Sequence, residues 1–347
     1  MVGRLPPSPL DSGNPNHSDD PLNTRSTVSV ILPTHNRSEL LKEAVASVHA
    51  QTFSDWEIVI VDDGSEPPVV LNPDETADHA ILLLRNQRAS GPCDARNTGI
   101  EAAHGEVLTF LDDDDLLAGN ALETIARAFL THPEIECLFV NIEPFGATGE
   151  VMLQTQASSL GAVLRKASIA AHSPEEELLL FNEGLFESLL DGLPLAFQRV
   201  ALRRSVLQRT GLYQPGPFND LEWPLRLALR CRCALLLTPL YRVRCDGQSY
   251  FTRGEAKEKL MDAIISIRRH LYDLPDVATQ PRLARKVRKS LAQARFDKSF
   301  YAHATHQRFP WLVFFQSFYG GFSWRHVSLM LKAIIAKLMG SRISGGR

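Results

Sequence analysis

The 347-residue chain lacks several patterns that would assign it to a common class of protein. No window approaches the run of about 18 apolar residues that a membrane-spanning helix needs. We expect no signal peptide, because no apolar segment follows the basic residue Arg4. The glycine-rich motifs Gly-x-x-x-x-Gly-Lys-Ser/Thr and Gly-x-Gly-x-x-Gly are also missing, which argues against a P-loop enzyme and a dinucleotide-binding fold.

Cysteine usage and charge exclude further classes. The five cysteines are scattered along the chain, and they do not form the two closely spaced Cys pairs that are typical of a zinc site. Their odd number is typical of a reduced cytoplasmic protein rather than of a disulfide framework. A net charge of −3 gives no reason to expect a nucleic-acid partner. The hydrophobic fraction of 44% is ordinary for a globular protein, and the length predicts about two domains.

The most informative stretch is a short apolar run that ends in four consecutive acids. Residues 107–111 contain a β-branched residue and an aromatic, and they predict a buried strand. Adjacent carboxylates repel one another unless a cation compensates them, and open α/β sheets bind ligands at the carboxyl ends of their strands. One interpretation is a divalent metal that carries a phosphate group. The other is a solvated acidic turn that caps the next helix. The four acids are Asp112, Asp113, Asp114 and Asp115.

The N-terminal half alternates strands with helices. This alternation predicts the α/β class, with a mostly parallel sheet covered by helices on both faces. Right-handed crossovers would bring the loops at residues 33–37, 62–65 and 112–115 to one edge of the sheet. Six carboxylates would meet there, and a diphosphate-linked ligand held by Mg²⁺ or Mn²⁺ would compensate them. Strands are predicted at residues 27–32, 56–61, 80–84, 107–111 and 135–140.

Four motifs, in this order, resemble those of the family 2 glycosyltransferases. They are Val30-Ile-Leu-Pro-Thr-His-Asn-Arg37, Ile58-Val-Ile-Val-Asp-Asp-Gly-Ser65, the segment 91–99 with Ala95-Arg-Asn97, and Phe110-Leu-Asp-Asp-Asp-Asp115. The resemblance is close over residues 27–142 and continues weakly to about residue 250. It implies the GT-A fold, a nucleotide-sugar donor, and inversion of configuration at the anomeric carbon.

The resemblance also implies which residues bind the donor. The second acid of the Asp-Asp-Gly-Ser turn, Asp63, would accept a hydrogen bond from the base, usually uracil, with Asp62 adjacent. The base and ribose would lie along Pro33, Thr34 and Asn36, and the nucleotide pocket would be lined by Arg96 and Asn97. Simpler interpretations stay open: Pro33 and Gly64 can be turn formers, Asn97 can be a satisfied polar residue on a helix, and His35 and Arg37 can be solvated.

The metal motif of the family is Asp-x-Asp, which matches residues 112–114. The resemblance implies that Asp114 binds Mn²⁺ or Mg²⁺ directly and that Asp112 holds the ribose or a metal-bound water. Asp113 stands where many relatives carry a small residue, and we include it in the donor site. Asp115 is expected to cap the following helix.

The second half is expected to supply the acceptor site and the catalytic base. Residues 197–204 predict a strand that leads into a short helix. Residues 211–228 resemble the family's segment around a Glu-Asp pair, whose place is taken by Asn219 and Asp220. The resemblance therefore implies that Asp220 is the base that takes the proton from the acceptor hydroxyl. Because Asn219 replaces an acid, Glu222 is an alternative base, and Asp220 can also be a simple helix N-cap.

We divide the chain into four parts. We expect residues 1–25 to form a disordered leader, 26–142 the nucleotide-sugar-binding half, 143–253 the half with the acceptor site and the base, and 254–347 a helical extension. Within the extension, residues 309–342 combine aromatic with basic residues. They form either an interfacial membrane helix or a helical appendage whose apolar stripe packs on the catalytic domain.

The sequence therefore predicts an inverting, metal-dependent glycosyltransferase. Its donor would be a nucleotide-diphospho-sugar, UDP-linked, and its acceptor a hydroxyl group of a saccharide or lipid-linked molecule in surface polysaccharide or glycolipid synthesis. The alternative is an inactive relative that binds nucleotide-sugar as a scaffold or regulator. We expect a cytoplasmic protein, on the inner face of the plasma membrane if the extension binds lipid. No pattern indicates an oligomeric state.

Overall fold

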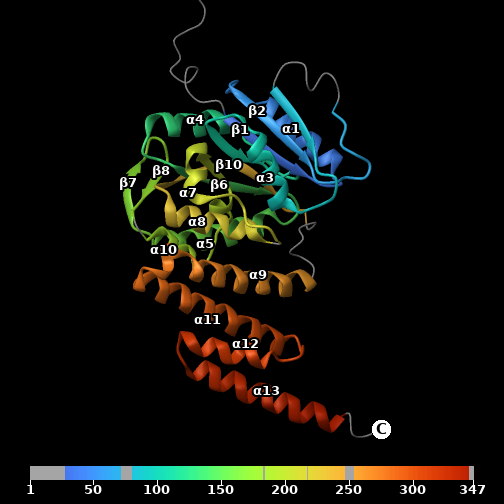
Figure 1. Ribbon diagram of the computed structural model, residues 1–347, viewed down its shortest axis with the longest axis vertical. Helices are drawn as coiled ribbons and strands as arrows, with labels where there is room; N and C mark the ends of the chain where they lie inside the picture. Colours follow the sequence, from blue (N-terminus) through green and yellow to red (C-terminus); the bar gives the residue numbers. More distant parts are fainter. Residues whose placement is uncertain (1–27, 72–79, 183, 217, 247–253, 344–347) are drawn as a thin grey trace, which may run out of the picture.

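A computed structural model describes residues 28–71, 80–182, 184–216, 218–246 and 254–343. An α/β part contains a single mixed sheet, and a stack of C-terminal helices follows it (Figure 1). The leader predicted for residues 1–25 lies outside the described residues. The strands are β1 (Val28–Thr34), β2 (Trp56–Asp62), β3 (Ala80–Arg85), β4 (Val107–Phe110), β5 (Leu116–Leu117), β6 (Cys137–Phe145), β7 (Ile169–Ser173), β8 (Leu178–Phe181), β9 (Val200–Arg203) and β10 (Cys233–Arg244).

The first four strands along one side of the sheet are parallel. The sheet order is β3-β2-β1-β4-β9-β6-β10-β8-β7, and β5 pairs with β10. The pairs β3–β2, β2–β1 and β1–β4 are parallel, whereas β9 lies antiparallel between β4 and β6. Thr34 stands opposite Asp62 and Ile31 opposite Phe110, so the carboxyl ends of β1, β2 and β4 share one edge. The prediction of an α/β fold with mostly parallel core strands is confirmed, and Pro33 belongs to β1 itself.

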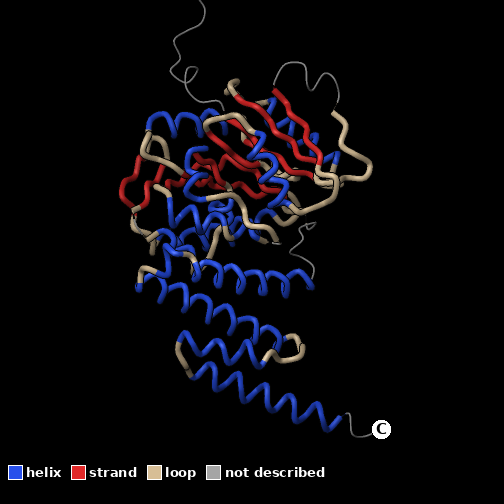
Figure 2. The backbone as a smooth tube through the Cα atoms, viewed as in Figure 1, coloured by secondary structure: helices blue, strands red, loops and turns tan. Residues whose placement is uncertain are grey.

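Helices cover both faces of the sheet, as Figure 2 shows. Side chains of a strand alternate between faces, so Ile31 packs into one apolar cluster and Leu32 into the other. The cluster on one face includes residues of α1 and α4, and the cluster on the other includes residues of α3, α8 and α9. The helices of this part are α1 (Ser38–His49), α3 (Pro92–Ala102), α4 (Ala121–Thr131), α5 (Gly149–Leu164), α6 (Leu185–Leu189), α7 (Leu207–Thr210) and α8 (Trp223–Arg230).

The C-terminal helices extend the core and then leave it. Ile267 and Leu271 of α9 are buried in the sheet's own apolar cluster, whereas Phe296, Phe314 and Leu329 form a separate small cluster further along the chain. The end of the chain thus packs on α11 rather than on the α/β part. Among the described residues, no helix is both long and apolar enough to cross a bilayer. The helices are α9 (Gly254–Asp273), α10 (Pro275–Ala278), α11 (Pro281–Ala304), α12 (Trp311–Gln316) and α13 (Trp324–Ile343).

Candidate active site

Residues at the end of β1 form hydrogen bonds with the segments that follow β2 and β4. The Thr34 hydroxyl donates to Asp113 Oδ2 at 2.8 Å. The Asn36 N–H donates to Ser65 Oγ at 2.9 Å, and the Glu66 N–H donates to Asn36 Oδ1 at 2.8 Å. Asn36 has a φ of 53°, a left-handed conformation that Asn tolerates better than most residues. The structure therefore brings the predicted base-and-ribose loop to the turn after β2 and to the acidic motif.

Asp62 holds the turn after β2. Its carboxylate accepts from the Ser65 N–H at 2.8 Å and from the Arg85 guanidinium at 2.6 Å. Burial alone would raise the pKa of Asp62, but these bonds outweigh it and the pKa is lowered. Gly64 follows with a φ of +73°, and a Cβ there would lie 2.7 Å from the backbone nitrogen of Ala89. Only glycine suits this turn, so Gly64 is required by the backbone, as one interpretation of the sequence holds.

Asp63 orders the neighbouring segment, residues 86–91. Its carboxylate accepts from the Gly91 N–H at 2.8 Å, from the N–H and hydroxyl of Ser90, and from the Asn86 side-chain amide at 2.8 Å. Burial would raise the pKa of Asp63, but these hydrogen bonds outweigh it and the pKa is lowered. The predicted contact between Asp63 and a nucleotide base stays a prediction.

The four acids after β4 face different partners. Carboxylate oxygens of Asp112, Asp114 and Asp115 lie within 4.8 Å of one another, a spacing that can hold a divalent ion. Asp113 is separate, because it bonds to Thr34 and to the guanidinium of Arg37 at 3.1 Å. Three oxygen ligands from one loop are a donor set that Mg²⁺ and Mn²⁺ favour. The group of acids that could hold an ion thus includes Asp115 in addition to Asp112 and Asp114.

Two arginines with mostly covered side chains pair with acids of this motif. Arg96 pairs with Asp112 at 2.5 Å, and Arg199 pairs with Asp115 at 2.7 Å and with Asp112 at 3.3 Å. Burial would raise the pKa of Asp112, but the two arginines lower it to about 2. For Asp115 burial dominates and raises the pKa to about 6. The expectation that Asp115 caps a helix is wrong: α4 begins only at Ala121, and Asp115 accepts instead from the Arg244 N–H at 2.9 Å.

Arg37, for which the sequence permits a simply solvated side chain, lies beside the acids of the candidate site. Its guanidinium lies 2.7 Å from Asp114 Oδ2. The pair is half-exposed, with 42% of the Arg37 side chain and 35% of the Asp114 side chain accessible. Burial and the neighbouring carboxylate of Asp112 raise the pKa of Asp114, while Arg37 opposes that rise. Arg37 therefore acts as the counter-ion of the predicted metal ligand.

Asn97 and Arg96 connect α3 to the second half of the chain. The Asn97 amide donates to the Tyr213 carbonyl at 2.9 Å and accepts from the Tyr213 N–H at 3.0 Å. The Arg96 guanidinium lies 5.6 Å from the centre of the Tyr213 ring, within range of a cation–π contact. The simpler interpretation of Asn97, a satisfied polar residue, describes its bonds in the structure. Its role in the nucleotide pocket stays a prediction.

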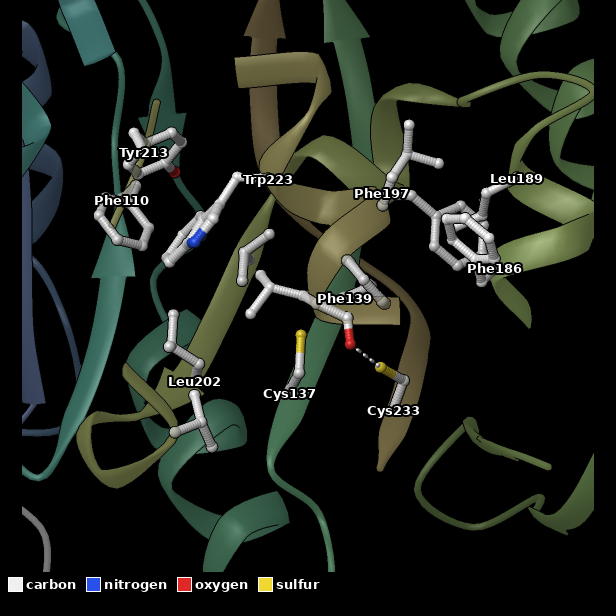
Figure 3. Packing of buried hydrophobic residues seen from close by; sticks show 14 of the residues in the cluster. Phe110, Cys137, Phe139, Phe186, Leu189, Phe197, Leu202, Tyr213, Trp223 and Cys233 are labelled. Carbon is white, nitrogen blue, oxygen red and sulfur yellow. Dashed lines mark hydrogen bonds between the residues drawn. The ribbon is translucent and has the colours of Figure 1, made fainter. Parts of the chain in front are cut away.

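Three aromatic rings bring the second half of the chain to the acidic motif (Figure 3). Phe110, the last residue of β4, lies edge-on to Tyr213 and to Trp223, with ring centres 5.7 and 5.5 Å apart. The rings of Tyr213 and Trp223 lie 4.1 Å apart. Phe110 precedes the acids by two residues, and Tyr213 and Trp223 flank Asp220 in sequence. Their packing therefore positions Asp220 beside the motif.

Asp220 and Asp112 line one cavity of about 20 Å³. Burial raises the pKa of Asp220, and the charges of Arg96 and Arg199 oppose that rise. A cavity of this volume holds about one water molecule. The lining residues are Arg96, Phe110, Asp112, Gln198, Arg199, Tyr213 and Asp220. A larger cavity of about 160 Å³ lies between α1 and residues 65–71 and includes none of the acids of the motif.

Glu222, the alternative base, does not line this cavity. It is 1% exposed, and its carboxylate accepts from Arg226 Nε at 2.9 Å and Nη2 at 2.7 Å. Arg226 also donates to the carbonyls of Thr210 and Leu212. This buried ion pair holds the segment before Asp220. Asp220 does not begin α8 either, because that helix starts at Trp223 and its N-cap is Glu222.

We expect Glu222→Ala to lower the free energy of unfolding by about 3–5 kcal/mol, because it leaves the Arg226 charge buried without its partner. Turnover per folded molecule should stay within about threefold of wild type. Urea unfolding and kinetics at low temperature measure the two effects. Glu123→Ala is the matched control, since Glu123 and Arg127 form an exposed pair with the same spacing, and it should cost less than about 1 kcal/mol. Lost turnover at unchanged stability would instead identify Glu222 as the base.

Similarity to known proteins agrees with this geometry. The sequence profile "Glycosyl transferase family 2" matches residues 29–210, more than half of the chain. The chain is 42% identical over 103 residues to a GalNAc(5)-diNAcBac-PP-undecaprenol beta-1,3-glucosyltransferase of Campylobacter jejuni. This match covers 29% of the chain and 33% of that protein. The chain is also 38% identical over 96 residues to a UDP-Glc:alpha-D-GlcNAc-diphosphoundecaprenol beta-1,3-glucosyltransferase of Escherichia coli. That match covers 28% of the chain and 38% of the relative. The matches thus span little more than a third of these relatives' length.

The fold is also that of a solved structure. Residues 1–349 of Staphylococcus aureus TarS superpose with a TM-score of 0.56 at 17% identity, covering 89% of this chain and 88% of that one. The same protein has been solved with UDP-GlcNAc, with a TM-score of 0.52 at 17% identity and coverage of 78% and 73%. This likeness concerns the fold alone. Together with the sequence profile it establishes that the chain belongs to the family 2 glycosyltransferases and has the GT-A fold.

Proposed function

We propose that the chain moves a sugar from a nucleotide-diphospho-sugar to a hydroxyl group of an acceptor, with inversion of configuration. The observation that carries the proposal is the cavity that Asp112 and Asp220 share. It joins an acid of the donor-side motif to the predicted base, although the two belong to different halves of the chain. Residues 26–142 would bind the donor, 143–253 would bind the acceptor and supply the base, and 254–347 would form the helical extension.

Asp220 is the proposed base. Its carboxylate takes the proton of the acceptor hydroxyl while that oxygen forms a bond to the anomeric carbon. The bond from the anomeric carbon to the diphosphate oxygen breaks on the opposite face, so a single displacement inverts the configuration. Arg96 and Arg199 favour the ionised form of Asp220, which a base requires before it can accept a proton.

The acidic motif fits a divalent cation. Asp112, Asp114 and Asp115 contribute converging carboxylate oxygens, which are the ligands that Mn²⁺ and Mg²⁺ prefer. We assign Asp114 as the direct ligand. A bound ion supplies positive charge that offsets the negative charge of the departing nucleotide diphosphate. The remaining donor-side residues of the proposal are Pro33, Thr34, Asn36, Asp62, Asp63, Arg96, Asn97, Asp112 and Asp113.

The names of the relatives support a narrower substrate class. One relative named above uses UDP-Glc, and both are named for undecaprenol-diphosphate saccharides. A third, 37% identical over 131 residues, is a putative colanic acid biosynthesis glycosyl transferase of Escherichia coli. We therefore propose a UDP-linked donor and a saccharide or lipid-linked acceptor in surface polysaccharide or glycolipid synthesis. The cytoplasmic face of the plasma membrane is the proposed location.

The second candidate is a relative that binds nucleotide-sugar without turning it over. The observation in its favour is the small cavity at Asp220, together with the arginines that pair with every acid of the motif. A panel of nucleotide-sugars with Mn²⁺ separates the two candidates, with thermal shift and nucleotide diphosphate release measured together. We expect one UDP-sugar to protect the protein and to be hydrolysed slowly. Protection without any release, even with saccharide acceptors, would favour the binding relative.

A further inference from the structure

Positive charge is concentrated at the C-terminal end of the chain. Residues 281–347 contain thirteen Lys and Arg residues and one acid, Asp297, although the whole chain has a net charge of −3. The preceding part is therefore strongly acidic. Three of these cations lie on α11 and pair with acids of the preceding part, namely Arg282, Lys286 and Lys298. Residues 311–343 contain four further Lys and Arg residues and no acid. A segment with this excess of basic residues attracts an anionic surface over the range of a Debye length, ~8–10 Å at physiological salt.

The same helices expose large apolar side chains. Of fourteen large hydrophobic residues that are exposed in the described part of the chain, eight lie between residues 312 and 335. Tyr319 is 72% exposed, Phe322 63% and Trp324 84%. These residues lie on α12, on α13 and between them, at the end of the stack farthest from the sheet (Figure 1). An apolar patch of this kind on a soluble part of a protein marks an interaction surface.

Helix α13 has apolar residues on two opposite faces. Leu329 and Ala333 are 3% and 4% exposed, and Leu329 belongs to the small cluster around Phe314. Leu331 and Ile335 are 51% and 53% exposed. At about 100° per residue, Trp324, Leu331 and Ile335 fall on one line, on the side opposite Leu329 and Ala333. The helix therefore satisfies its packing with one stripe and leaves a second stripe without a partner among the described residues.

Basic residues accompany the exposed stripe. Arg325 follows Trp324 and Lys332 follows Leu331, so the two exposed cations form a line about 100° around the helix from the apolar one. A helix that lies in a bilayer interface has this arrangement, with aromatic and aliphatic residues facing the acyl chains and Lys and Arg at the level of the phosphates. The pattern distinguishes a bilayer from a second copy of the chain, because two such faces would bring positive charges together.

We propose that α12, residues 317–323 and α13 dock the protein on an anionic lipid bilayer. Trp324, Leu331 and Ile335 enter the boundary between headgroups and acyl chains, and Arg325 and Lys332 contact lipid phosphates. Each basic residue near such a surface adds to the attraction. This contact requires no turnover. Its consequence, delivery of the catalytic part to a lipid-linked acceptor, rests on the proposed function.

Sedimentation of the full chain with vesicles tests the proposal. Vesicles of phosphatidylcholine with 30% phosphatidylglycerol should bind the wild type at least tenfold more strongly than pure phosphatidylcholine, and 0.5 M NaCl should reduce that binding. The double variant Trp324→Glu/Leu331→Glu should lose at least tenfold in partitioning. Arg325→Gln/Lys332→Gln should lose most of the preference for the anionic lipid. Val151→Glu is the matched control, because Val151 is an exposed valine on α5, 69% accessible and outside this surface.

Three results would overturn the proposal. The first is equal binding to both kinds of vesicle, and the second is unchanged binding of the Trp324→Glu/Leu331→Glu variant. The third is a wild-type dimer that this variant dissociates, with no vesicle binding, which would assign the stripe to a second copy. Hydrolysis of the donor in solution is measured alongside. A variant that loses vesicle binding but hydrolyses donor normally separates this proposal from the proposed function.

Discussion

Asp220→Asn is expected to lower kcat by about 10²–10⁴-fold, the usual contribution of a general base, and to leave donor binding intact. Asparagine has nearly the same size as aspartate but cannot accept the proton of the acceptor hydroxyl. Asp220 lies half-buried in the cavity with Asp112, so the neutral side chain should be tolerated there. Donor-dependent thermal shift and nucleotide diphosphate release, measured on the same preparation, report binding and turnover separately.

A control variant addresses disturbance of the nearby helix. Asp276 pairs with Arg230 at the far end of α8, and Asp276→Asn should leave kcat within about twofold of wild type. If Asp220→Asn turns over normally, the base lies elsewhere and the proposed mechanism fails. The same failure would follow if both variants lost activity equally, because the effect would then come from α8 rather than from a proton transfer.

The pH dependence of turnover gives a second readout of Asp220. Burial raises the pKa of this carboxyl above that of an ordinary aspartate. A base must be ionised, so kcat should fall as the pH falls through this raised pKa and should level off above it. We therefore expect the acid limb of the kcat profile at a higher pH than the ordinary aspartate pKa of about 3.9. An activity that stays constant down to that value would contradict the assignment.

The edge of the sheet was predictable because its signals are local. The apolar runs at β1, β2 and β4 end in turn-forming or acidic residues, and their hydrophobic period marks them as strands. Parallel connections then determine which ends lie together. The order of the four motifs indicates the family. The family resemblance in turn predicts that Thr34, Asp112 and Asp220 lie around one site.

The contacts of these residues were not predictable, because they depend on distant partners. The strand β9 has four residues and pairs with β4 and β6, whose partner residues lie more than sixty positions earlier in the chain. Periodicity carries no information on such pairing, so the sequence offers no sign that Arg199, just before β9, meets Asp112 and Asp115. The prediction that Asp115 caps the next helix fails for the same reason, because its partner Arg244 belongs to β10.

Asp114→Asn is expected to weaken Mn²⁺ binding by at least about 100-fold, since even the loss of a supporting outer-shell group costs about 10–100-fold. Asp114 is the most exposed of the three converging acids and lies nearest to solvent. Asparagine at this position has no negative charge and has an amide group in place of one of the two carboxylate oxygens. Electron paramagnetic resonance of free Mn²⁺, or titration calorimetry without donor, measures the affinity directly and needs no turnover. Unchanged affinity would place the ion away from this motif.

Arg37→Gln should change the same affinity in the opposite direction. The Arg37 guanidinium lies 2.7 Å from Asp114 Oδ2. We therefore expect it to compete with a divalent ion for this carboxylate. A half-exposed pair of this kind contributes up to about 1 kcal/mol, so its loss should tighten Mn²⁺ binding by up to about fivefold. Lys42→Gln is the matched control. Lys42 pairs with Glu39 on the adjacent helix α1, and its replacement removes an equal charge. Equal tightening by both variants would mean that only overall charge matters. Weaker binding in Arg37→Gln would mean that Arg37 supports the ion site instead of competing for it.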